Sequence, residues 1–540
     1  MTPHPGLRPA RWAALATLVT TSVLLTACGS GGADPGTGTD GRAKSGGTLT
    51  FAVSSDTGCV DPQQVGSNDT IYSLRQVVDS LTDQDPKTGR ITPWLAKSWD
   101  ISSDATTFTF HLRSGVTFSD GTKLTARVVK DNFDAVPRLG ALAPLAKGYL
   151  SGVESTTAID PLTVRVKFQQ PNAQFLQATS THSLGIESAA SVRRTPERKC
   201  AEGVIGSGPF VLKDYVQNQS ITLARRTGYA WGSPLWRKKG EAYLDKLVFK
   251  VVPEAGVRVG SLRSGQVDAI GGVGKADEAT LKGGQVRLAR RANPGSVFNL
   301  GLNNSRPVLK DVRVRQAILY AIDRKQIADT VYPTGTRPAS SILAHTTPDY
   351  KDLGTALAHD AAKATSLLDS AGWRTGGDGI RSKDGARLRL TVKWFANSAT
   401  NQPALELIQQ QLKAVGIDVV LKQLQISQIA QTQQSGDFDG LWGNLTRADP
   451  DILRTQYSTG LANAYRIPAS PLDSLLTRQA ATTDPAERTE LVGKAQQLIV
   501  RNAYVVPVVE LQTQLGVANK VHNLDFEASS RIQLHDTWIG

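Results

Sequence analysis

Residues 107–134 have the sequence TFTFHLRSGVTFSDGTKLTARVVKDNFD. The part from 107 to 118 predicts two short strands joined by a Ser-Gly turn, and residues 119–121 add a second turn. Thr125 is then placed to cap a helix over residues 126–134, because its hydroxyl can accept a hydrogen bond from a main-chain N–H in the first helical turn. This stretch predicts strands and helices close together in the sequence.

The same mixture continues along the chain. Strand patterns occur at 47–53, 162–168, 210–224, 247–252, 388–395, 417–424 and 504–509. Helix patterns occur at 70–81, 255–264, 311–330, 358–371, 402–414 and 484–500, the last with Thr483 or Asp484 as its cap. Intermixed strands and helices favour α/β or α+β lobes.

The composition is that of an ordinary globular protein. The chain has 540 residues, of which 40% are hydrophobic and 20% charged, and its net charge is +13. At about 100–200 residues per domain, this length predicts two to four domains or lobes. The basic residues are scattered and form no stripe with aromatic residues, so nucleic-acid binding is not expected.

The first 27 residues are predicted to be a signal peptide. Arg8 and Arg11 precede an apolar run over residues 12–27, which is too short to span a membrane comfortably. The sequence LTAC at residues 25–28 resembles the bacterial lipobox, in which the thiol accepts a diacylglyceryl group and a peptidase cuts before the Cys. We therefore expect Cys28 to be the lipid attachment site. An ordinary secretory signal with an incidental Cys, and a short membrane anchor, are the alternatives.

Residues 28–46 are rich in Gly, Ser, Thr and Asp. Such a segment buries little apolar surface, so it is predicted to be a flexible tether. Two acyl chains make anchoring stable. We expect a soluble body on the extracytoplasmic face of the cell membrane, held there by the lipid.

Cysteine usage agrees with that compartment. The chain has three Cys, and with Cys28 assigned to lipid, Cys59 and Cys200 remain. An even number of thiols in an oxidising compartment favours a disulfide. This bond would close a long loop and could add up to about 4–5 kcal/mol of stability. Two unrelated buried thiols are the alternative.

Five segments resemble the peptide, dipeptide and nickel class of solute-binding proteins of ABC importers, extracellular solute-binding protein family 5. They are FHLRSGVTFSDGT at 110–122, IGSGPFV at 205–211, VFNLGLNNSRPVLKDVRVRQAILYAID at 297–323, AGW at 371–373 and DP at 449–450. Each signal is weak alone, but the five occur in the order of the family. They extend the resemblance over essentially the whole chain from residue 47.

The resemblance implies an α/β fold of the periplasmic-binding-protein type, with two lobes, a hinge, a cleft and an additional α+β domain in lobe one. Lobe one is expected to contain residues 47–82, 203–294 and 509–540, the extra domain 83–202, and lobe two 295–508. Closure over a ligand is a hinge motion, and the closed state is what a permease would recognise. We expect a monomer that captures a peptide-like or anionic small organic solute and delivers it to an ABC permease.

In peptide-binding members of that family, an Asp three residues before the acidic-Pro pair holds the amino terminus of the ligand. The matching position here is Thr446, so that carboxylate is missing. Arg447 follows it and would favour an anion. We therefore predict a ligand without a free amino terminus, bound near Asn444, Thr446, Arg447 and Asp449. The alternative is a shifted loop in which Asp449 or Asp451 takes the amine.

Aromatic side chains are candidates for the cleft walls, because large rings give contact area at low entropic cost. They are Trp442, Trp394, Phe395 and, as a weaker candidate, Tyr72. Core packing explains Trp394 at least as well.

Two further pairs of residues lie in the matched segments. Gly206 and Gly208 are expected to allow unusual main-chain angles, in a turn that could bring N–H groups to a cleft wall. Arg313 and Arg315, at a helix start, are expected to form surface ion pairs with residues such as Asp311.

No pattern of an enzyme site is found. The chain has no Gly-x-Ser-x-Gly, and Gly274-Lys275 lacks the first glycine and the Ser or Thr of a P-loop. Its seven His show no close pairing for a metal, so no catalytic residue, metal ligand or cofactor is expected. The alternatives are a metal-chelate binder or a surface receptor for a peptide signal on the same fold and, less favoured, a secreted hydrolase.

Overall fold

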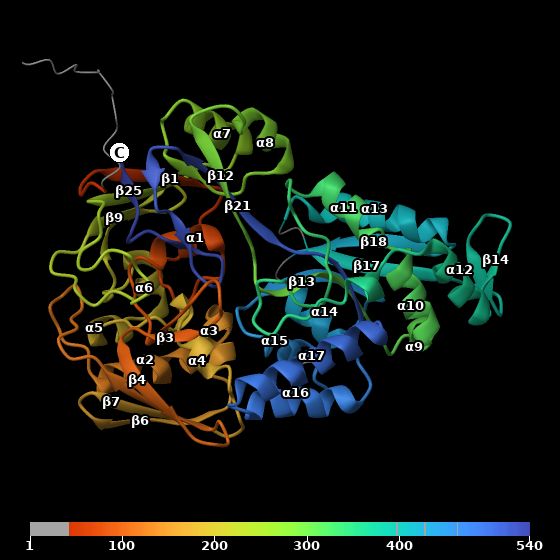
Figure 1. Cartoon of the computed structure of the whole chain (residues 1–540), viewed down its shortest axis with the longest axis horizontal. Helices are drawn as coiled ribbons and strands as arrows, with labels where there is room; N and C mark the ends of the chain where they lie inside the picture. The colour runs from red at the N-terminus through yellow and green to blue at the C-terminus, as the bar shows by residue number, and fades with distance from the viewer. Residues whose placement is uncertain (1–42, 396–397, 426–427, 462) are drawn as a thin grey trace, which may run out of the picture. The chain divides into compact units, whose positions relative to one another are not determined.

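The computed structural model describes residues 43–395, 398–425, 428–461 and 463–540 (Figure 1). The predicted signal peptide, Cys28 and most of the predicted tether lie outside these ranges. Residues 43–540 form one unit by their internal contacts. Within the described ranges, no helix has both the length and the apolar character needed to cross a membrane.

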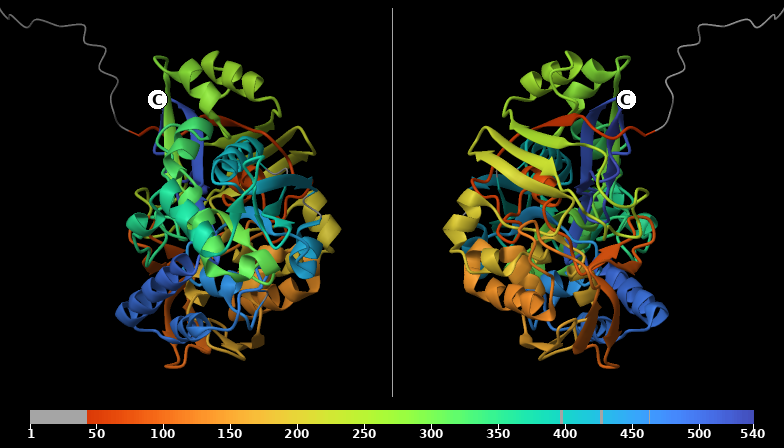
Figure 2. Two further views of the ribbon diagram at one scale, coloured as in Figure 1. Left: turned by 90° about the vertical axis from the view of Figure 1, so that its right-hand side faces the viewer. Right: turned by 90° about the vertical axis from the view of Figure 1, so that its left-hand side faces the viewer.

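A seven-stranded sheet contains, in spatial order, β12 (Val286–Ala292), β21 (Gln512–Ala518), β11 (Ala269–Ile270), β1 (Thr48–Val53), β10 (Lys246–Val251), β9 (Ser220–Arg225) and β8 (Phe210–Val216). Strand β1 is parallel to β10 and β11, whereas β21 is antiparallel to β11 and β12. Helices α7 (Ala255–Arg263) and α8 (Lys275–Leu281) lie together at one end of this sheet (Figures 1 and 2). Val259 and Leu262 of α7 are buried there in a small apolar core.

A five-stranded sheet contains, in spatial order, β18 (Asp418–Leu424), β17 (Arg389–Phe395), β19 (Gly440–Thr446), β13 (Gly295–Leu302) and β20 (Val505–Val509). Strand β17 is parallel to β18 and β19, and β13 is antiparallel to β19 and β20. The larger helices of this part are α10 (Val312–Ala321), α11 (Arg324–Val331), α12 (Ala361–Ser370), α13 (Asn401–Ala414), α16 (Pro471–Ala481) and α17 (Pro485–Arg501). The apolar faces of α10, α11, α12 and α13 form the largest hydrophobic core with the sheet, whereas α16 and most of α17 pack in a second core.

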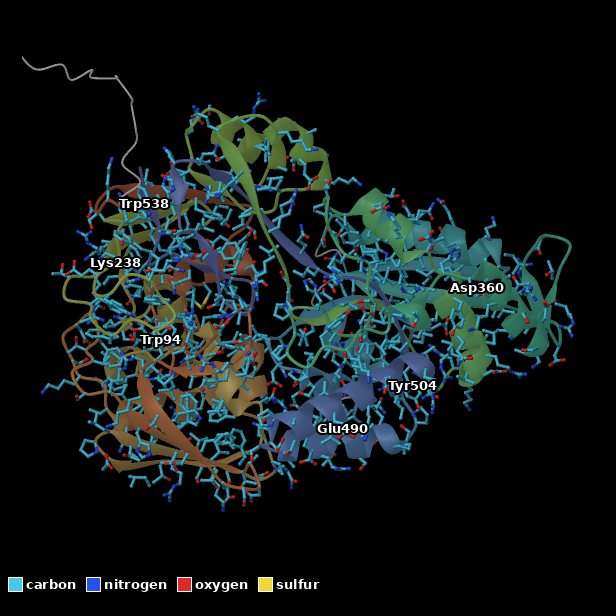
Figure 3. All side chains as sticks on the ribbon, in the orientation of Figure 1. Trp94, Lys238, Asp360, Glu490, Tyr504 and Trp538 are labelled. Carbon is cyan, nitrogen blue, oxygen red and sulfur yellow. A yellow bond between two sulfur atoms is a disulfide. The ribbon has the colours of Figure 1, made fainter. Side chains whose placement is uncertain are left out.

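A four-stranded antiparallel sheet contains, in spatial order, β4 (Ala96–Ile101), β5 (Thr107–Leu112), β7 (Thr163–Phe168) and β6 (Val153–Asp160). Helix α2 (Ala126–Leu139) packs against it, and Thr125 caps that helix by accepting a hydrogen bond from the N–H of Val128, as predicted. Phe175 packs edge-on against Phe108 of β5, with ring centroids 5.1 Å apart. Trp94, labelled in Figure 3, is buried beneath the guanidinium of Arg75, 4.7 Å from the ring centroid.

The remaining elements are short. The helices are α1 (Asn68–Leu74), α3 (Pro144–Tyr149), α4 (Phe175–Ala178), α5 (Ala189–Val192), α6 (Pro196–Glu202), α9 (Pro307–Lys310), α14 (Ile429–Ser435) and α15 (Ile452–Tyr457). The paired strands are β2 (Thr82–Gln84) with β3 (Ile91–Pro93), β22 (Val521–His522) with β25 (Trp538–Ile539), and β23 (Asp525–Phe526) with β24 (Ile532–Gln533). A further small sheet holds β14 (Arg374–Thr375), β15 (Arg381–Lys383) and β16 (Ala386–Arg387).

Two chain crossings join the seven-stranded and the five-stranded sheets. One runs from β12 to β13 and the other from β20 to β21. Asn293 ties them together: its N–H donates to the carbonyl oxygen of Leu511 at 2.7 Å, and its Oδ1 accepts from the hydroxyl of Thr513 at 2.7 Å. Two short crossings are the geometry of a hinge between two lobes.

Two predicted helices are shorter than expected. The helix predicted over 70–81 ends at Leu74, because the carbonyl oxygens of Gln76 and Val77 accept hydrogen bonds from the 205–211 turn. The helix predicted over 311–330 is divided at Ile322, whose main chain is extended. Asp323 caps the second half by accepting from the N–H of Gln326. Tertiary pairing and a cap thus override a continuous helical period.

The expectation of unusual main-chain angles at the two glycines of the 205–211 turn is wrong. Gly206 and Gly208 do not have positive φ angles. They are needed for a close approach, since a Cβ on Gly206 would lie 1.9 Å from the carbonyl oxygen of Val77. The N–H of Gly208 donates to that same oxygen, so it serves internal packing rather than a cleft wall.

The prediction for the two arginines is half right. Arg313 forms the expected ion pair with Asp311, at 2.7 Å. Arg315 is buried instead and donates to the carbonyl oxygens of Leu309, Lys310 and Asn502. It is therefore a core residue that satisfies main-chain acceptors.

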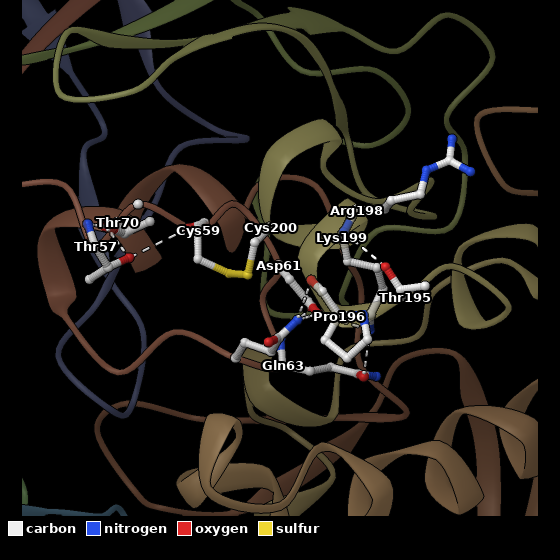
Figure 4. Close-up of a disulfide and its surroundings, with 12 residues drawn as sticks. Thr57, Cys59, Asp61, Gln63, Thr70, Thr195, Pro196, Arg198, Lys199 and Cys200 are labelled. Atoms are coloured by element: carbon white, nitrogen blue, oxygen red, sulfur yellow. Dashed lines mark hydrogen bonds and ion pairs between the residues drawn. A yellow bond between two sulfur atoms is a disulfide. The ribbon is translucent and has the colours of Figure 1, made fainter.

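Cys59 and Cys200 form a disulfide, which confirms the prediction (Figure 4). The bond joins the loop after β1 to helix α6. Next to it, Lys199 is buried between Asp61 at 2.8 Å and Glu187 at 3.2 Å, and both carboxylates are fully buried. Burial and the charge of Asp61 raise the pKa of Glu187, while Lys199 opposes that rise.

Asp79 is a second buried acid, beside the same turn. It accepts hydrogen bonds from the Nε1–H of Trp231 at 2.9 Å and the hydroxyl of Tyr229 at 3.1 Å. Burial raises the pKa of Asp79 to about 7, although these hydrogen bonds and Arg75 oppose the rise.

This pKa predicts a pH dependence of stability. Because the folded pKa lies above the unfolded value of about 4, Asp79 contributes stability at low pH that is lost as the pH rises through about 7. The free energy of unfolding of wild type should therefore fall relative to that of Asp79→Asn as the pH rises. The difference between the two proteins should shift by roughly 2 kcal/mol in favour of the variant between about pH 5 and pH 7.5. Urea unfolding at both pH values measures this difference. Exposed Asp214→Asn is the control, and equal pH dependence in both variants would contradict the assignment.

Candidate functional site

Strand β19 and the residues after it hold most of the predicted ligand-binding positions. Trp442 is buried and stacks on Phe298, with ring centroids 5.4 Å apart and an interplanar angle of 12°. Its Nε1–H donates to Oδ1 of Asn401 at 3.1 Å. Trp394 and Phe395, at the end of β17, are also buried, each in an apolar core. The structure thus places all three aromatic residues in packed surroundings.

The two acids of this stretch are each paired with an arginine. Asp449 accepts two hydrogen bonds from Arg488, at 2.6 and 3.0 Å. Asp451 accepts two from Arg454, at 2.7 and 2.8 Å. Bidentate pairs of this kind use both oxygens of the carboxylate. Each acid therefore already has a cationic partner, and the alternative in which one of them takes a ligand amine stays a prediction.

Arg447 contacts the part of the chain that holds the four-stranded sheet. Its guanidinium lies over the ring of Tyr149, 4.8 Å from the centroid, and donates to Gln174 at 3.3 Å and Thr455 at 3.1 Å. Among the described residues, no carboxylate forms an ion pair with it. Asn444 and Thr446, on β19, are partly exposed.

Further contacts join the same two parts of the chain. The side chain of Gln84 donates to the carbonyl oxygen of Ala448 at 2.9 Å, and the N–H of Ala173 donates to Ala480 at 2.9 Å. At a separate place, the N–H of Thr334 donates to Glu278 of α8 at 3.0 Å. The part of the chain with the seven-stranded and four-stranded sheets therefore contacts the part with the five-stranded sheet at two separate places.

Tyr72 belongs to a different buried group. It packs against Phe51 of β1, with ring centroids 5.7 Å apart. Burial and the charge of Asp69 raise the pKa of Tyr72, whereas the positive charge of Arg531 opposes the rise. Tyr72 is therefore a neutral hydroxyl with a cation nearby.

His182 and Arg531 are buried polar residues, and the positive charge of Arg531 acts on both His182 and Tyr72. His182 is 1% exposed, and neither ring nitrogen makes a hydrogen bond of normal geometry with the described residues. Burial and the positive charges of Arg531 and Arg75 lower its pKa well below the usual range, so the ring is neutral. Arg531 is 8% exposed, its Nε is unpaired, and it forms no ion pair within the described part of the chain.

We call Tyr72, His182 and Arg531 the Arg531 cluster. Buried polar groups are nearly always satisfied, and a buried charge without a partner is costly. The positive charge of Arg531 acts on both the His182 ring, which is neutral, and the Tyr72 hydroxyl, which also has Thr513 as a hydrogen-bond partner. The cluster is therefore suited to an anionic oxygen group. Sequence reasoning missed two of its members, since no local motif marks either of them.

The described residues contain no group of three or more His, Cys, Asp or Glu that could hold a metal ion.

The sequence matches a known protein family. Residues 90–463 match the family described as "Bacterial extracellular solute-binding proteins, family 5 Middle". The chain belongs to this family. Its members are substrate-binding proteins of ABC transporters and not enzymes, which confirms the family and the non-enzymatic role predicted from the sequence.

Relatives of this family 5 protein bind different solutes. Heme-binding protein A of Haemophilus influenzae is 27% identical over 468 residues, covering 81% of this chain and 82% of the relative. The nickel-binding periplasmic protein of Escherichia coli is 27% identical over 360 residues, covering 65% and 66%. The structure of NikA from Brucella suis in complex with Fe(III)-EDTA has a TM-score of 0.79 and 24% identity, covering 92% of this chain and all of that one. This likeness confirms the two-lobed α/β fold.

Proposed function

We propose that the protein is a lipid-anchored receptor on the extracytoplasmic face of the membrane, where it captures a small anionic organic solute and delivers it to the permease of an ABC importer. The family supports the role of solute binding, and the lipobox-like LTAC sequence supports anchoring through Cys28. The observation that carries the ligand class is Arg531, a buried guanidinium with no acidic partner among the described residues.

The arrangement of the acids supports a ligand without a free amine. A peptide amino terminus needs a carboxylate, yet Thr446 stands at the expected position. Asp449 and Asp451 are held by Arg488 and Arg454. A peptide-like solute remains compatible if its amine is blocked and its anionic group reaches Arg531.

The first experiment identifies the solute. Native mass spectrometry of the full chain purified from its host should detect a carried molecule, which is released and identified by fragmentation. Calorimetry then compares di- to pentapeptides with their N-acetylated forms and with small di- and tricarboxylates. Tight binding of free-amine peptides, with no binding of the acetylated forms or carboxylates, would overturn the anionic ligand class.

A variant tests the role of Arg531. Arg531→Met keeps a long apolar side chain but removes the charge, so the affinity for the released solute should fall at least about tenfold. Arg263→Met, at the exposed end of α7, is the matched control and should bind as wild type does. Calorimetry gives both affinities, and circular dichroism checks that both variants are folded. Equal affinity in the two variants would remove Arg531 from the site.

A further inference from the structure

A cavity of about 200 Å³ lies beside the two crossings that join the lobes. Its lining includes Arg290, Arg291, Arg337, His345, Glu510 and Gln512. None of the three members of the Arg531 cluster lines it, so it is a different site. Three of these six side chains are arginines, which makes the cavity strongly basic.

The lining residues come from both lobes. Arg290 and Arg291 are consecutive residues of β12, in the seven-stranded sheet. Arg337 and His345 belong to the chain between α11 and α12, beside the five-stranded sheet. Glu510 and Gln512 lie at the second crossing itself. A group bound here would contact both sides of the hinge.

Among the described residues, the acids nearby form an ion pair with only one of these arginines, Arg290. Both oxygens of Glu510 face His345: one accepts from its main-chain N–H at 3.0 Å and the other contacts Nδ1 at 2.5 Å. Glu278 pairs with Arg290 at 3.1 Å. Among the described residues, Arg291 donates only to oxygens of neutral groups, including the carbonyl of Pro86 at 2.7 Å and the hydroxyl of Ser530 at 3.1 Å.

Two donors are left over. Arg337 is exposed and forms no ion pair or hydrogen bond through its side chain in the described part of the chain. The Nε2 of Gln512 is buried and has no hydrogen-bond partner among the residues that the structure describes. Burial lowers the pKa of Arg291, although Glu527 opposes this, and a nearby anion would relieve the cost of that buried charge. The cavity therefore combines unneutralised charge with an unused amide donor.

We propose that this hinge cavity is a second binding site, which takes a small oxyanion such as free phosphate or a carboxylate. The anion joins Arg291 of β12 to Arg337 of the other lobe and accepts from the amide of Gln512. Because it contacts both lobes, it stabilises the present arrangement of the hinge. By linkage, an anion that favours this arrangement also favours any solute that requires it.

The test is titration of the full chain with sodium phosphate, and in parallel with sodium acetate, at an ionic strength held constant with sodium chloride. Calorimetry should show saturable binding of at least one of the two anions. Arg337→Ala should weaken that binding at least about tenfold, because a charge-assisted hydrogen bond is lost. Gln512→Glu, which places a carboxylate in the cavity, should weaken it further. Arg263→Ala, which replaces an exposed arginine at the end of α7 that does not line the cavity, should leave it unchanged.

Arg531→Met separates the two sites. The hinge site predicts that anion binding is unchanged in Arg531→Met and at least about tenfold weaker in Arg337→Ala. The reverse pattern would place the anion in the Arg531 cluster and overturn the hinge site. Absence of saturable binding by wild type, or equal weakening in Arg337→Ala and Arg263→Ala, would overturn it as well.

Discussion

Replacing Lys199 by methionine is expected to lower the free energy of unfolding by about 3–5 kcal/mol. Lys199 lies between two fully buried carboxylates, at 2.8 Å from Asp61 and 3.2 Å from Glu187. Methionine fills a similar volume but leaves both acids without a cation. Breaking a buried ion pair by removing one partner costs far more than the pair contributes, because an uncompensated charge remains in a medium of low polarity.

The same variant should depend on pH in a defined direction. Burial and the charge of Asp61 already raise the pKa of Glu187, and without Lys199 the interaction that opposes this rise is lost, so the folded pKa of Glu187 increases further above its unfolded value. The stability of the variant is then greatest at low pH and falls as the pH rises, so its deficit relative to wild type grows between about pH 5 and pH 8. Chemical unfolding at several pH values measures the deficit.

Lys167→Met provides the control for Lys199→Met. Lys167 pairs with Glu154 at 3.0 Å, but both side chains are about half exposed. Loss of such a surface pair should cost only about 0–1 kcal/mol. If the free energy of unfolding falls by the same small amount in both variants, Lys199 is not the residue that neutralises the buried acids.

Most strands and helices could be predicted because their patterns are local. Strand β17 and helix α17 begin within one residue of the predicted positions, and Asp484 caps α17 as one of the two predicted candidates. The errors occur where distant segments decide the outcome. Gln76 and Val77 leave the helical conformation to pair with a turn some 130 residues later, and no helical period reports such a partner.

The site is harder to predict for the same reason. The charge of Arg531 acts on His182 although the two residues are far apart in the sequence, and a lone His or Arg has no local pattern that marks it as unpaired. The Arg488 that holds Asp449 lies 39 residues away. Aromatic residues such as Trp442 fit a core and a cleft wall equally well by composition. Contact of the solute with Thr446 or Asn444 stays a prediction.

Replacing both Cys59 and Cys200 by serine is the other change with a large expected effect. The bond joins residues separated by 141 positions in the sequence. Removing it frees the unfolded chain from a long closed loop, which in the chain-entropy model lowers the free energy of unfolding by about 5 kcal/mol. Urea unfolding of wild type with and without a reducing agent should give free energies of unfolding that differ by about this amount. The double variant should be insensitive to the reducing agent.

Combining the two changes tests whether the disulfide also positions the buried acids. Cys200 follows Lys199 directly in α6, and the N–H of Val60 donates to the carbonyl oxygen of Cys200 at 3.0 Å. Residues in such contact are not independent, so the loss in the triple variant should differ from the sum of the separate losses by about 0.5–3 kcal/mol. A loss smaller than the sum is expected, because loosening α6 lets water reach Asp61 and Glu187. Strict additivity would mean that the bond acts on the unfolded chain alone.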